Sequence, residues 1–501
     1  MEYSTLESYG NLLKALHMVK DIDLLGKGSK IVNGLTYDSR DAAPGTLFIC
    51  KGAAFKKEYL EDALASGALA YISEERYELQ VDVPYILVKD IRTVMSTIAD
   101  KFFNSVWKSL KITAFGGTKG KSTSTYYMKA IVDDYMNDVG GEESAVLSTI
   151  DDYDGIELVE AHNTTPEAVE LHRHMYNAVN SGITFMEMEV SSQALKYHRV
   201  DDLRFDVGVF LNISEDHISP VEHKDFEDYI SSKMKMFELT DHAVINLDSD
   251  HIRRVLDAAE ASEDIHTFSV KNDNADYYAY DVRRNGGETI FNIRCAGFDE
   301  EFKLTMPGTF NVSNAVAAAA AADILGIPSE YIKSGLYRAK ARGRMELFTS
   351  TDGIVTAIVD YAHNKLSFGT LFESIKEEYP EHDIVAVFGS SGDKANVRRK
   401  ELGEIAGKYS EKAYLVPDDP GKSSAYLVSK EIAEHLNCPY EIMDTRGEGI
   451  QKAIMECVRP TIVLILGKSN EKYQKYGDEF VPCLSDIEYT ERYMHEYEEH
   501  H

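Results

Sequence analysis

A short stretch rich in glycine, lysine and hydroxyl side chains is the part of this chain best suited to chemistry. Residues 115–125 read Phe-Gly-Gly-Thr-Lys-Gly-Lys-Ser-Thr-Ser-Thr. Gly117 and Gly120 allow a tight turn, so that successive backbone N–H groups can point at one anion, and a helix starting just after them adds partial positive charge. Lys121 can reach the β- and γ-phosphates of a nucleotide, and a hydroxyl of the next two residues can ligate Mg²⁺. The stretch predicts a phosphate-binding loop, with ATP as the first candidate.

This loop departs from the general G-x-x-x-x-G-K-[ST] pattern, because Phe115 stands where the first glycine is expected. The shorter form G-T-x-G-K-[ST] remains. An apolar run at 112–115 leads into the loop and a helix-like run at 126–135 leads out of it. This order of strand, loop and helix favours the phosphate loop over the alternative, an ordinary strand–helix turn.

Acidic side chains and a histidine follow two other strand-like runs. Glu187 and Glu189 lie two residues apart in the run 183–190, so a strand would place both on one face. Glu189 is nearer the carboxyl end and is the better Mg²⁺ ligand candidate, although an ordinary exposed glutamate is an equal alternative. Asp216 and His217 follow the run 207–213 and suit metal or phosphate chemistry, although a lone histidine is more often structural.

The elements that must position these residues alternate between strands and helices, which predicts an α/β fold with mostly parallel sheets. Three units are expected: a small α/β unit at 1–108, a central phosphate-loop unit at 109–341 and a Rossmann-like unit at 342–501. In the last unit polar loops follow four strand-like runs, and ligands bind beyond the carboxyl ends of parallel strands. The segment Thr164-Thr165-Pro166-Glu167 reads as a helix start capped by threonine.

Composition limits the classes of function. The 501 residues suggest about three domains. A net charge of −31 argues against nucleic acid or an anionic membrane as partner. Five scattered cysteines indicate reduced thiols in a cytoplasm and no zinc site, and neither a signal peptide nor a membrane-spanning run is visible. The acidic end, Glu498 to His501, is expected to be a solvated tail.

Motifs along most of the chain resemble those of the Mur ligases, and among these the MurE type, which adds the third residue of the peptidoglycan stem peptide. The matching motifs are Tyr37-Asp38-Ser39-Arg40, Pro44-Gly45-Thr46-Leu47-Phe48, Gly117-Thr118-Lys119-Gly120-Lys121-Ser122-Thr123, Thr164-Thr165-Pro166-Glu167, Met188-Glu189-Val190-Ser191-Ser192, Asp216-His217, Phe310-Asn311-Val312-Ser313-Asn314, Gly343-Arg344-Met345-Glu346 and Asp360-Tyr361-Ala362-His363. Each motif alone is weak, but their shared order across three units is specific.

The resemblance implies a role for each unit and for the matching residues. The N-terminal unit should hold the uridine nucleotide, the central unit ATP, and the C-terminal unit the incoming amino acid. The muramoyl-peptide substrate is expected at Ser39, Thr164, Thr165, Ser191 and Arg199. ATP is expected at Gly117, Thr118, Lys119, Gly120, Lys121, Ser122, Thr123, Asn311, Arg344 and Asp360. Two Mg²⁺ ions are expected around Thr123, Glu189, His217 and Lys233, the last matching the lysine that this family carbamylates.

The resemblance also implies a reaction. The γ-carboxylate of D-glutamate in UDP-MurNAc-L-Ala-D-Glu attacks the γ-phosphate of ATP, and the amine of an amino acid then displaces phosphate from the acyl phosphate. Lys121, Lys233, Glu189 and His217 are the expected catalytic residues. The protein would thus be an ATP-dependent amide-forming ligase, working as a monomer in a bacterial cytoplasm.

The amino acid that is added depends on the loop Asp418-Asp419-Pro420-Gly421. The relatives that use meso-diaminopimelate carry Asp-Asn-Pro-Arg there, and that arginine holds the distal carboxylate. Gly421 cannot do so, whereas Asp418, Asp419 and Glu471 suit an ammonium group. We therefore expect L-lysine, with L-ornithine as the alternative; meso-diaminopimelate stays open because Lys422 could replace the arginine.

Two other functions would share part of this set of motifs. Folylpolyglutamate synthase would share the phosphate loop, but not the Asp38-Ser39-Arg40 motif or the Thr164-Thr165-Pro166-Glu167 motif. A non-catalytic nucleotide-binding homologue would have no need to keep Lys121, Glu189 and Lys233 together.

Overall fold

The computed structural model describes residues 3–52, 55–214, 218, 222–285, 287–392 and 396–501. The chain divides into two compact units. The first contains Met1–Thr125, Val132–Phe268 and Ala320–Ile327, and the second contains Tyr126–Ile131, Ser269–Ala319 and Pro328–His501. Among the described helices none is long and apolar enough to cross a membrane.

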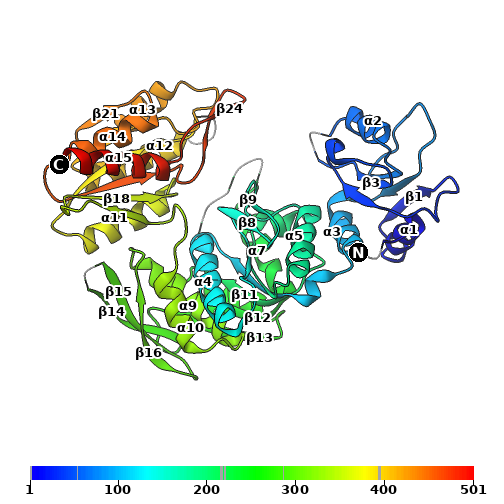
Figure 1. Cartoon of the computed structure of the whole chain (residues 1–501), viewed down its shortest axis with the longest axis horizontal. Helices are drawn as coiled ribbons and strands as arrows, with labels where there is room; N and C mark the ends of the chain where they lie inside the picture. The colour runs from blue at the N-terminus through cyan, green and yellow to red at the C-terminus, as the bar shows by residue number, and fades with distance from the viewer. Residues whose placement is uncertain (1–2, 53–54, 215–217, 219–221, 286, 393–395) are drawn as a thin grey trace. The chain divides into compact units, whose positions relative to one another are not determined.

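The N-terminal part of the first unit is a five-stranded sheet with the order β1-β5-β4-β3-β2, in which only β1 runs antiparallel to its neighbour (Figure 1). Its apolar faces pack against the helices, with Leu6, Tyr9 and Ile98 fully buried. The elements are α1 (Leu6–Ala15), β1 (Val19–Asp23), β2 (Gly34–Thr36), β3 (Thr46–Ile49), α2 (Lys57–Ala65), β4 (Ala70–Ser73), β5 (Tyr85–Val88) and α3 (Ile91–Phe102).

The central part of the first unit is a larger sheet with the order β13-β12-β11-β6-β10-β7-β8-β9. The strands from β13 to β7 are parallel, and β8 and β9 add an antiparallel edge. The elements are β6 (Lys111–Gly116), α4 (Lys121–Val139), β7 (Ala145–Leu147), β8 (Asp151–Tyr153), β9 (Leu158–Glu160), α5 (Ala168–Asn180), β10 (Phe185–Glu189), α6 (Ser192–Lys196), β11 (Phe205–Phe210), α7 (Phe226–Met234), β12 (Thr240–Asn246), α8 (Ile252–Ala259) and β13 (Asp264–Ser269).

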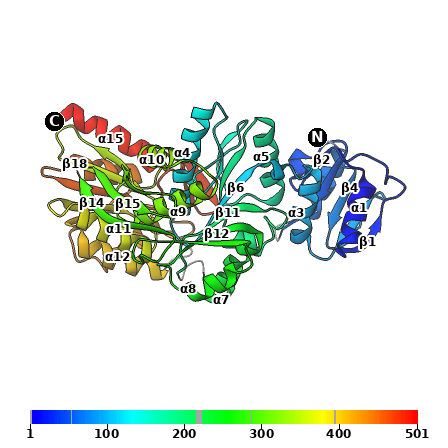
Figure 2. The same ribbon diagram turned by 90° about the horizontal axis from the view of Figure 1, so that it is seen from below.

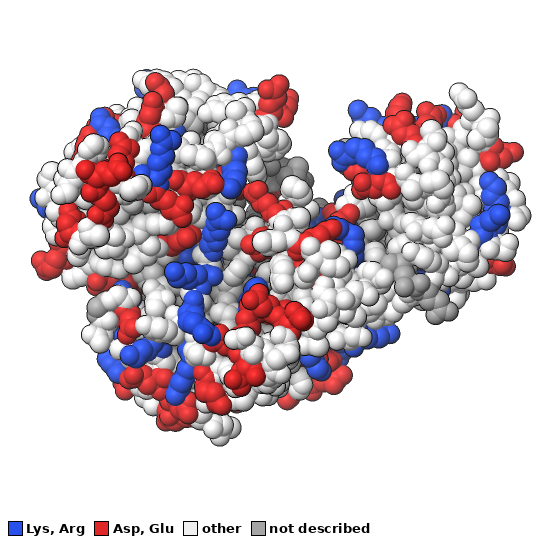
Figure 3. All heavy atoms as spheres, in the orientation of Figure 1, with Lys and Arg blue, Asp and Glu red and all other residues white. Residues whose placement is uncertain are grey.

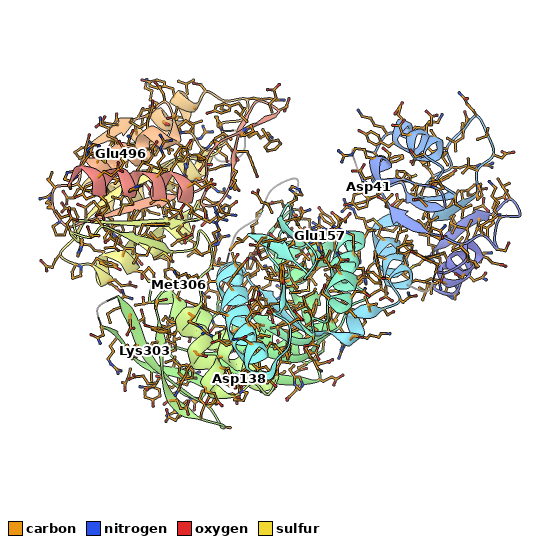
Figure 4. All side chains as sticks on the ribbon, in the orientation of Figure 1. Asp41, Asp138, Glu157, Lys303, Met306 and Glu496 are labelled. Atoms are coloured by element: carbon orange, nitrogen blue, oxygen red, sulfur yellow. The ribbon has the colours of Figure 1, made fainter. Side chains whose placement is uncertain are left out.

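The second unit begins with an antiparallel group, β14-β15-β16, followed by two helices. Lys303 of β16 lies 3.5 Å from Glu288 of β15, and Figure 4 labels Lys303. The elements are β14 (Tyr277–Asn285), β15 (Glu288–Arg294), β16 (Asp299–Leu304), α9 (Phe310–Ile324) and α10 (Ser329–Arg338). Residues 315–322, all alanine except Val316, lie in α9 and are fully buried.

The C-terminal part of the second unit is a six-stranded sheet with the order β17-β18-β22-β19-β20-β21, parallel except for β17. Helices cover both faces: Figure 2 shows α15 on one side of the sheet and α11 and α12 on the other. The elements are β17 (Glu346–Thr349), β18 (Val355–Asp360), α11 (Lys365–Glu378), β19 (Asp383–Phe388), α12 (Asn396–Tyr409), β20 (Lys412–Leu415), α13 (Ala425–Ala433), β21 (Tyr440–Ile442), α14 (Arg446–Met455), β22 (Thr461–Leu466), β23 (Tyr473–Tyr476), β24 (Glu479–Pro482) and α15 (Asp486–His500).

One expectation about local structure was wrong. Helix α5 begins at Ala168 with Glu167 as its cap residue, and no side chain caps it, because the Thr165 hydroxyl bonds elsewhere. The chain end is exposed as expected, yet it is helical as far as His500. Helix α15 packs on α14, where Gln451 Nε2 donates to the Glu496 carboxylate at 3.0 Å (Figure 4).

Candidate active site

The expected phosphate loop joins β6 directly to α4. The helix begins at Lys121, and Gly120 just before it has a φ of +86°. Gly117 has a φ of +147°, and a Cβ there would lie 3.0 Å from the Leu211 Cβ and 3.2 Å from the backbone nitrogen of Asn212. Both backbone conformation and space therefore require glycine at position 117.

Asn212, just beyond β11, holds this loop in place. Its Oδ1 accepts from the Lys119 N–H at 2.8 Å, and its Nδ2 donates to the Lys119 carbonyl at 3.0 Å. Its own carbonyl accepts from the Thr118 N–H at 3.0 Å. Three bonds from one residue fix the loop backbone before any nucleotide binds.

Lys121 and Lys233 meet at one carbonyl group of the loop. Lys121 Nζ donates to the Gly117 carbonyl at 3.1 Å, and Lys233 Nζ donates to the same oxygen at 2.7 Å. Lys233 lies on α7, is only 4% exposed, and sits 4.9 Å from the ring centre of Tyr229. The Tyr229 hydroxyl lies 3.0 Å from the Thr118 hydroxyl. The structure therefore brings Lys233 to the loop from 116 residues away in sequence.

Glu189 ends β10, in register with Phe115 at the end of β6. Its carboxylate accepts from the Thr149 N–H at 2.8 Å and from the Thr149 hydroxyl at 3.1 Å. Glu189 is 1% exposed and Glu187 is fully buried, so the alternative of exposed glutamates was wrong for both. Within the part of the chain that the structure describes, no lysine or arginine pairs with Glu189. A buried carboxylate without a cation is costly, so this site fits a metal ion.

Thr123 and His217 are the two further residues expected at Mg²⁺. Thr123 lies in the first turn of α4 and is 7% exposed, beside Ser122 at 8%. Their hydroxyls therefore stand at the helix end that follows the loop. His217 and Asp216 lie outside the described residues.

Three of the residues expected at the muramoyl-peptide lie together beside the end of β10. The Thr165 hydroxyl donates to the Glu189 carbonyl at 2.8 Å and accepts from the Ser191 N–H at 3.0 Å. Arg199 Nη1 donates to the Thr165 carbonyl at 2.9 Å. The Thr164 hydroxyl lies 3.5 Å from that of Thr149, the residue that binds Glu189.

Glu167 connects this cluster to the N-terminal sheet. One carboxylate oxygen lies 2.6 Å from Arg199 Nη2, and the other lies 2.6 Å from Nζ of Lys51. Lys51 also lies 4.4 Å from the ring centre of Tyr37. Ser39 follows two residues later, in a short helical turn where the Asp38 carboxylate bonds Arg40 and the pKa of Asp38 falls to about 2.

The other residues expected at ATP lie in the second unit. Asp360, at the end of β18, accepts from the Met345 N–H at 2.9 Å and from the Ala362 N–H at 2.8 Å. The Arg344 guanidinium lies 4.6 Å from the ring centre of Tyr361. Asn311, in the first turn of α9, is 1% exposed and donates to the Pro307 carbonyl at 2.6 Å.

The acids expected at the amino acid surround a buried lysine. Lys468 Nζ, at the end of β22, lies 2.9 Å from Asp419 Oδ1 and 2.5 Å from Glu471 Oε2. Burial opposes the charge of Lys468, but the carboxylates of Glu471, Asp419 and Asp418 raise its pKa. The Tyr361 hydroxyl donates to Glu471 at 2.9 Å. A chain of contacts thus runs from the Arg344 side chain to these acids.

Asp418 lies on the same edge of the C-terminal sheet. Burial raises its pKa to about 6, against the opposing charges of Arg446 and Lys468. A Cβ on Gly467 would lie 2.5 Å from Asp418 Oδ2, and the φ of Gly467 is +113°. Glycine at 467 therefore leaves the space in which this carboxylate lies. Arg446 is itself paired with Asp486, 2.8 Å away.

The loop expected to decide the amino acid bends sharply at Gly421, whose φ is +57°. Its N–H donates to the Lys475 carbonyl at 2.9 Å, and its carbonyl accepts from the Gly477 N–H at 2.6 Å. The loop is thereby joined to the hairpin of β23 and β24. Lys422 is exposed, and its ammonium lies 3.1 Å from Asp478.

Five residues at these places were not predicted as site residues: Thr149, Glu167, Asn212, Tyr229 and Lys468. Glu167 and Asn212 carry a usable signal, since one stands in a recognised motif and the other directly follows a buried strand. The others show their role only through contacts distant in sequence.

Comparison with protein families decides between the interpretations. The model of the Mur ligase middle domain matches residues 115–322, and that of the Mur ligase glutamate ligase domain matches residues 343–469. The chain belongs to the Mur ligase family. Members of this family are ATP-dependent enzymes that form amide bonds, so the non-catalytic alternative loses its support.

Among individual relatives, the UDP-N-acetylmuramoyl-L-alanyl-D-glutamate–L-lysine ligase of Streptococcus agalactiae is 38% identical over 473 residues, covering 92% of each chain. The corresponding 2,6-diaminopimelate ligase of Caldanaerobacter subterraneus is 33% identical over 469 residues, covering 92% of this chain and 94% of the relative.

Solved structures confirm the expected α/β fold. A UDP-N-acetylmuramoyl-L-alanyl-D-glutamate–2,6-diaminopimelate ligase aligns over 100% of both chains with a TM-score of 0.68 and 24% identity. The MurF ligase of Thermotoga maritima, solved in complex with ADP, aligns over 95% of this chain and 99% of its own with a TM-score of 0.63 and 18% identity.

Proposed function

We propose that this Mur ligase joins L-lysine to the D-glutamate of UDP-N-acetylmuramoyl-L-alanyl-D-glutamate at the expense of ATP. Relatives at 38% identity that cover nearly the whole chain carry this activity in their names. Residues 1–108 would hold the uridine nucleotide, 109–341 ATP, and 342–501 the amino acid. The enzyme would work as a monomer in the cytoplasm, where ATP and the nucleotide-linked precursor are available.

In the first half-reaction the D-glutamyl carboxylate attacks the γ-phosphate of ATP, so two anions must approach each other. Lys121 would leave the Gly117 and Thr118 carbonyls, to which its flexible side chain donates, and bind the transferring phosphoryl group. Arg344 would add a second positive charge from the C-terminal unit. Arg199, Thr165, Ser191 and Thr164 would position the peptide part of the acceptor, and Ser39 its uridine part.

Two Mg²⁺ ions would be held by Thr123, Glu189, His217 and the carbamate of Lys233. Bound Mg²⁺ would supply positive charge that offsets the phosphates. A lysine carbamate keeps one N–H, so Lys233 can still donate to the Gly117 carbonyl after modification while its new carboxylate extends beyond. Glu189 has no cationic partner among the described residues, which is the situation expected of a metal ligand.

The observation that carries the choice of amino acid is the charge around Lys468. Asp418, Asp419 and Glu471 bring three carboxylates to one edge of the sheet, where Lys468 supplies one ammonium. The other nearby cation, Arg446, is balanced by its partner Asp486. Above the pKa of Asp418, about 6, two negative charges are left over. A distal ammonium on the substrate would be attracted there, whereas a distal carboxylate would be repelled. The exposed Lys422 pairs with Asp478, which leaves it little suited to hold a substrate carboxylate.

Product mass spectrometry tests this proposal. Purified enzyme receives UDP-N-acetylmuramoyl-L-alanyl-D-glutamate, ATP, Mg²⁺ and one amino acid at a time: L-lysine, L-ornithine or meso-diaminopimelate. The product of lysine addition should form at least 100-fold faster than that of diaminopimelate addition, since burying an unpaired carboxylate costs about 3 kcal/mol or more. Faster addition of ornithine or diaminopimelate would refute the assignment, and ADP release without any amide product would refute the ligase.

A further inference from the structure

A cluster of two histidines and one aspartate on β12 and β13 takes no part in the proposed reaction. His242 of β12 stands opposite Asp264 of β13 in the parallel register. His266 lies two residues beyond Asp264 and therefore on the same face of the strand. The His242 and His266 rings have centres 5.8 Å apart. Neighbouring strands thus present three metal-ligating side chains at one place.

Three possible ligand atoms of this cluster lie close together. Asp264 Oδ2 lies 3.1 Å from His266 Nε2 and 3.8 Å from His242 Nδ1. Neither of these ring nitrogens makes a hydrogen bond within the described part of the chain, although both are shielded from solvent. All three possible ligand atoms lie within 4.8 Å of one another. Two ring nitrogens that make no hydrogen bond among the described residues therefore converge with one carboxylate oxygen.

The second oxygen of Asp264 is already engaged, which orients the carboxylate. Oδ1 accepts from the Ile265 N–H at 2.9 Å, so that Oδ2 is the oxygen turned to the histidines. The acids next to the cluster in sequence have different partners. Asp241 and Glu263 both pair with Arg204. Acids there have a protein cation, whereas Asp264 has only the two imidazoles.

From this arrangement we propose that His242, Asp264 and His266 bind one divalent transition-metal ion of the Zn²⁺ class. Two imidazoles and a carboxylate form a ligand set suited to Zn²⁺, Co²⁺, Ni²⁺ or Cu²⁺, whereas Mg²⁺ prefers oxygen ligands alone. The side chains are partly exposed, at 43%, 57% and 26%, so water can complete the coordination. The bound ion would tie β13 to β12.

This site is separate from the one that handles ATP. The phosphate loop and Glu189 follow the carboxyl ends of β6 and β10. His242 is the third residue of β12 and Asp264 is the first residue of β13, so the cluster lies at the amino ends of parallel strands. In a parallel sheet all amino ends of the strands lie on one side and all carboxyl ends on the opposite side.

Zinc binding by the full-length, untagged chain tests the proposal. Protein freed of metal by a chelator is titrated with Zn²⁺ against a chromophoric chelator, in the presence of millimolar Mg²⁺. Wild type should bind one Zn²⁺ that His242→Ala and His266→Ala each weaken at least about 10-fold. Saturating Zn²⁺ should raise the Tm of wild type and not of either variant. Equal Zn²⁺ affinity in wild type and His266→Ala, or displacement of Zn²⁺ by Mg²⁺, would overturn it.

Two controls separate this site from others that could take zinc. The double variant His500→Ala/His501→Ala removes the histidines at the chain end and should bind Zn²⁺ as wild type does; loss of binding there would refute the site. Co²⁺ added to wild type should give visible d–d absorption without a sulfur-to-cobalt charge-transfer band. Such a band would show that the metal binds the free cysteines instead, and it would overturn the proposal. This measurement uses wild type alone, so it does not depend on whether a variant folds.

Discussion

Lys121 and Lys233 donate to the same carbonyl oxygen, that of Gly117, from 3.1 Å and 2.7 Å. Two ammonium groups in contact with one oxygen repel each other. Carbamylation of Lys233 would replace one positive charge by a negative one and relieve this repulsion. Lys121 would then be the cation of the pair, free to follow the phosphate.

Replacing Lys121 by alanine should reduce kcat at least about 100-fold, because one preorganised positive charge at the transferring phosphoryl group is lost. ADP release and amide formation should fall together, with little change in Tm. Lys14→Ala, on the exposed face of α1, is the matched control and should keep full activity. A Lys121→Ala enzyme with more than one tenth of wild-type turnover would contradict the assigned role.

Activity should depend on dissolved CO2 through Lys233. Carbamate forms when the neutral amine attacks CO2 and loses a proton, so CO2-depleted buffer should lower kcat and added bicarbonate should restore it. Labelled bicarbonate should give a carbamate carbon signal in NMR spectra of wild type and none in Lys233→Arg. If wild type gives no such signal and bicarbonate changes nothing, Lys233 acts as an ordinary lysine.

Replacing Glu167 by glutamine should raise KM for the UDP-linked substrate about 10-fold and leave KM for ATP unchanged. The change removes the charge that holds Arg199 and Lys51, and charge-assisted bonds of this kind contribute about 1–2 kcal/mol. Glu160→Gln, at the exposed end of β9, serves as control. Equal KM values in the two variants would show that Glu167 does not position the acceptor.

His172 on α5 should make folding stability depend on pH. It is fully buried, neither ring nitrogen has a hydrogen-bond partner among the described residues, and burial lowers its pKa to about 4. Between pH 6.5 and 4 the histidine is protonated in the unfolded protein but stays neutral in the folded protein. The wild type therefore loses stability as pH falls from 6.5 to 4. As pH falls over this window, the free energy of unfolding of His172→Leu should rise by about 3 kcal/mol relative to that of wild type.

The test must compare the stability of the variant with that of wild type at each pH, because Asp152 changes stability with pH in the opposite direction. Burial raises its pKa to about 7, so its contribution weakens folding as pH rises from 3.8 to 7 in wild type and variant alike. Chemical denaturation of both proteins at several pH values cancels this shared effect. The exposed His495→Leu should follow wild type. Parallel profiles for His172→Leu and wild type would contradict the prediction.

The elements nearest to the chemistry were predictable because they depend on local patterns. The apolar runs at 112–115, 183–190 and 207–213 correspond to β6 (Lys111–Gly116), β10 (Phe185–Glu189) and β11 (Phe205–Phe210), with bounds that differ by one to three residues. The antiparallel strands β14 to β16 were not predicted, because their sequences mix polar and apolar residues and depend on cross-strand pairing. The Thr165 hydroxyl donates to the Glu189 carbonyl at the end of β10 instead of capping α5. That acceptor comes near Thr165 only when the sheet has folded.

The candidate site divides in the same way. The phosphate loop is continuous in sequence, so Gly117, Gly120 and Lys121 could be named directly. Lys233 lies in a segment with no distinctive pattern. Lys468 lies in a polar loop after a strand-like run, but the sequence does not show that it contacts the distant Asp419. Net charge was also a weak guide to the surface: Figure 3 shows basic side chains interspersed with acidic ones on the visible face, despite the total of −31. Spatial arrangement, not composition, determines which charges meet.

The turn at Gly421 limits how this enzyme could evolve a new substrate. An arginine placed there would have to adopt a φ of +57°, which costs an L-residue about 1–2 kcal/mol, and it would enter a loop bonded on both sides to the β23–β24 hairpin. A single codon change is therefore a poor route to diaminopimelate. Because backbone bonds join the loop to the hairpin, a change of substrate at this loop is expected to need substitutions in both segments.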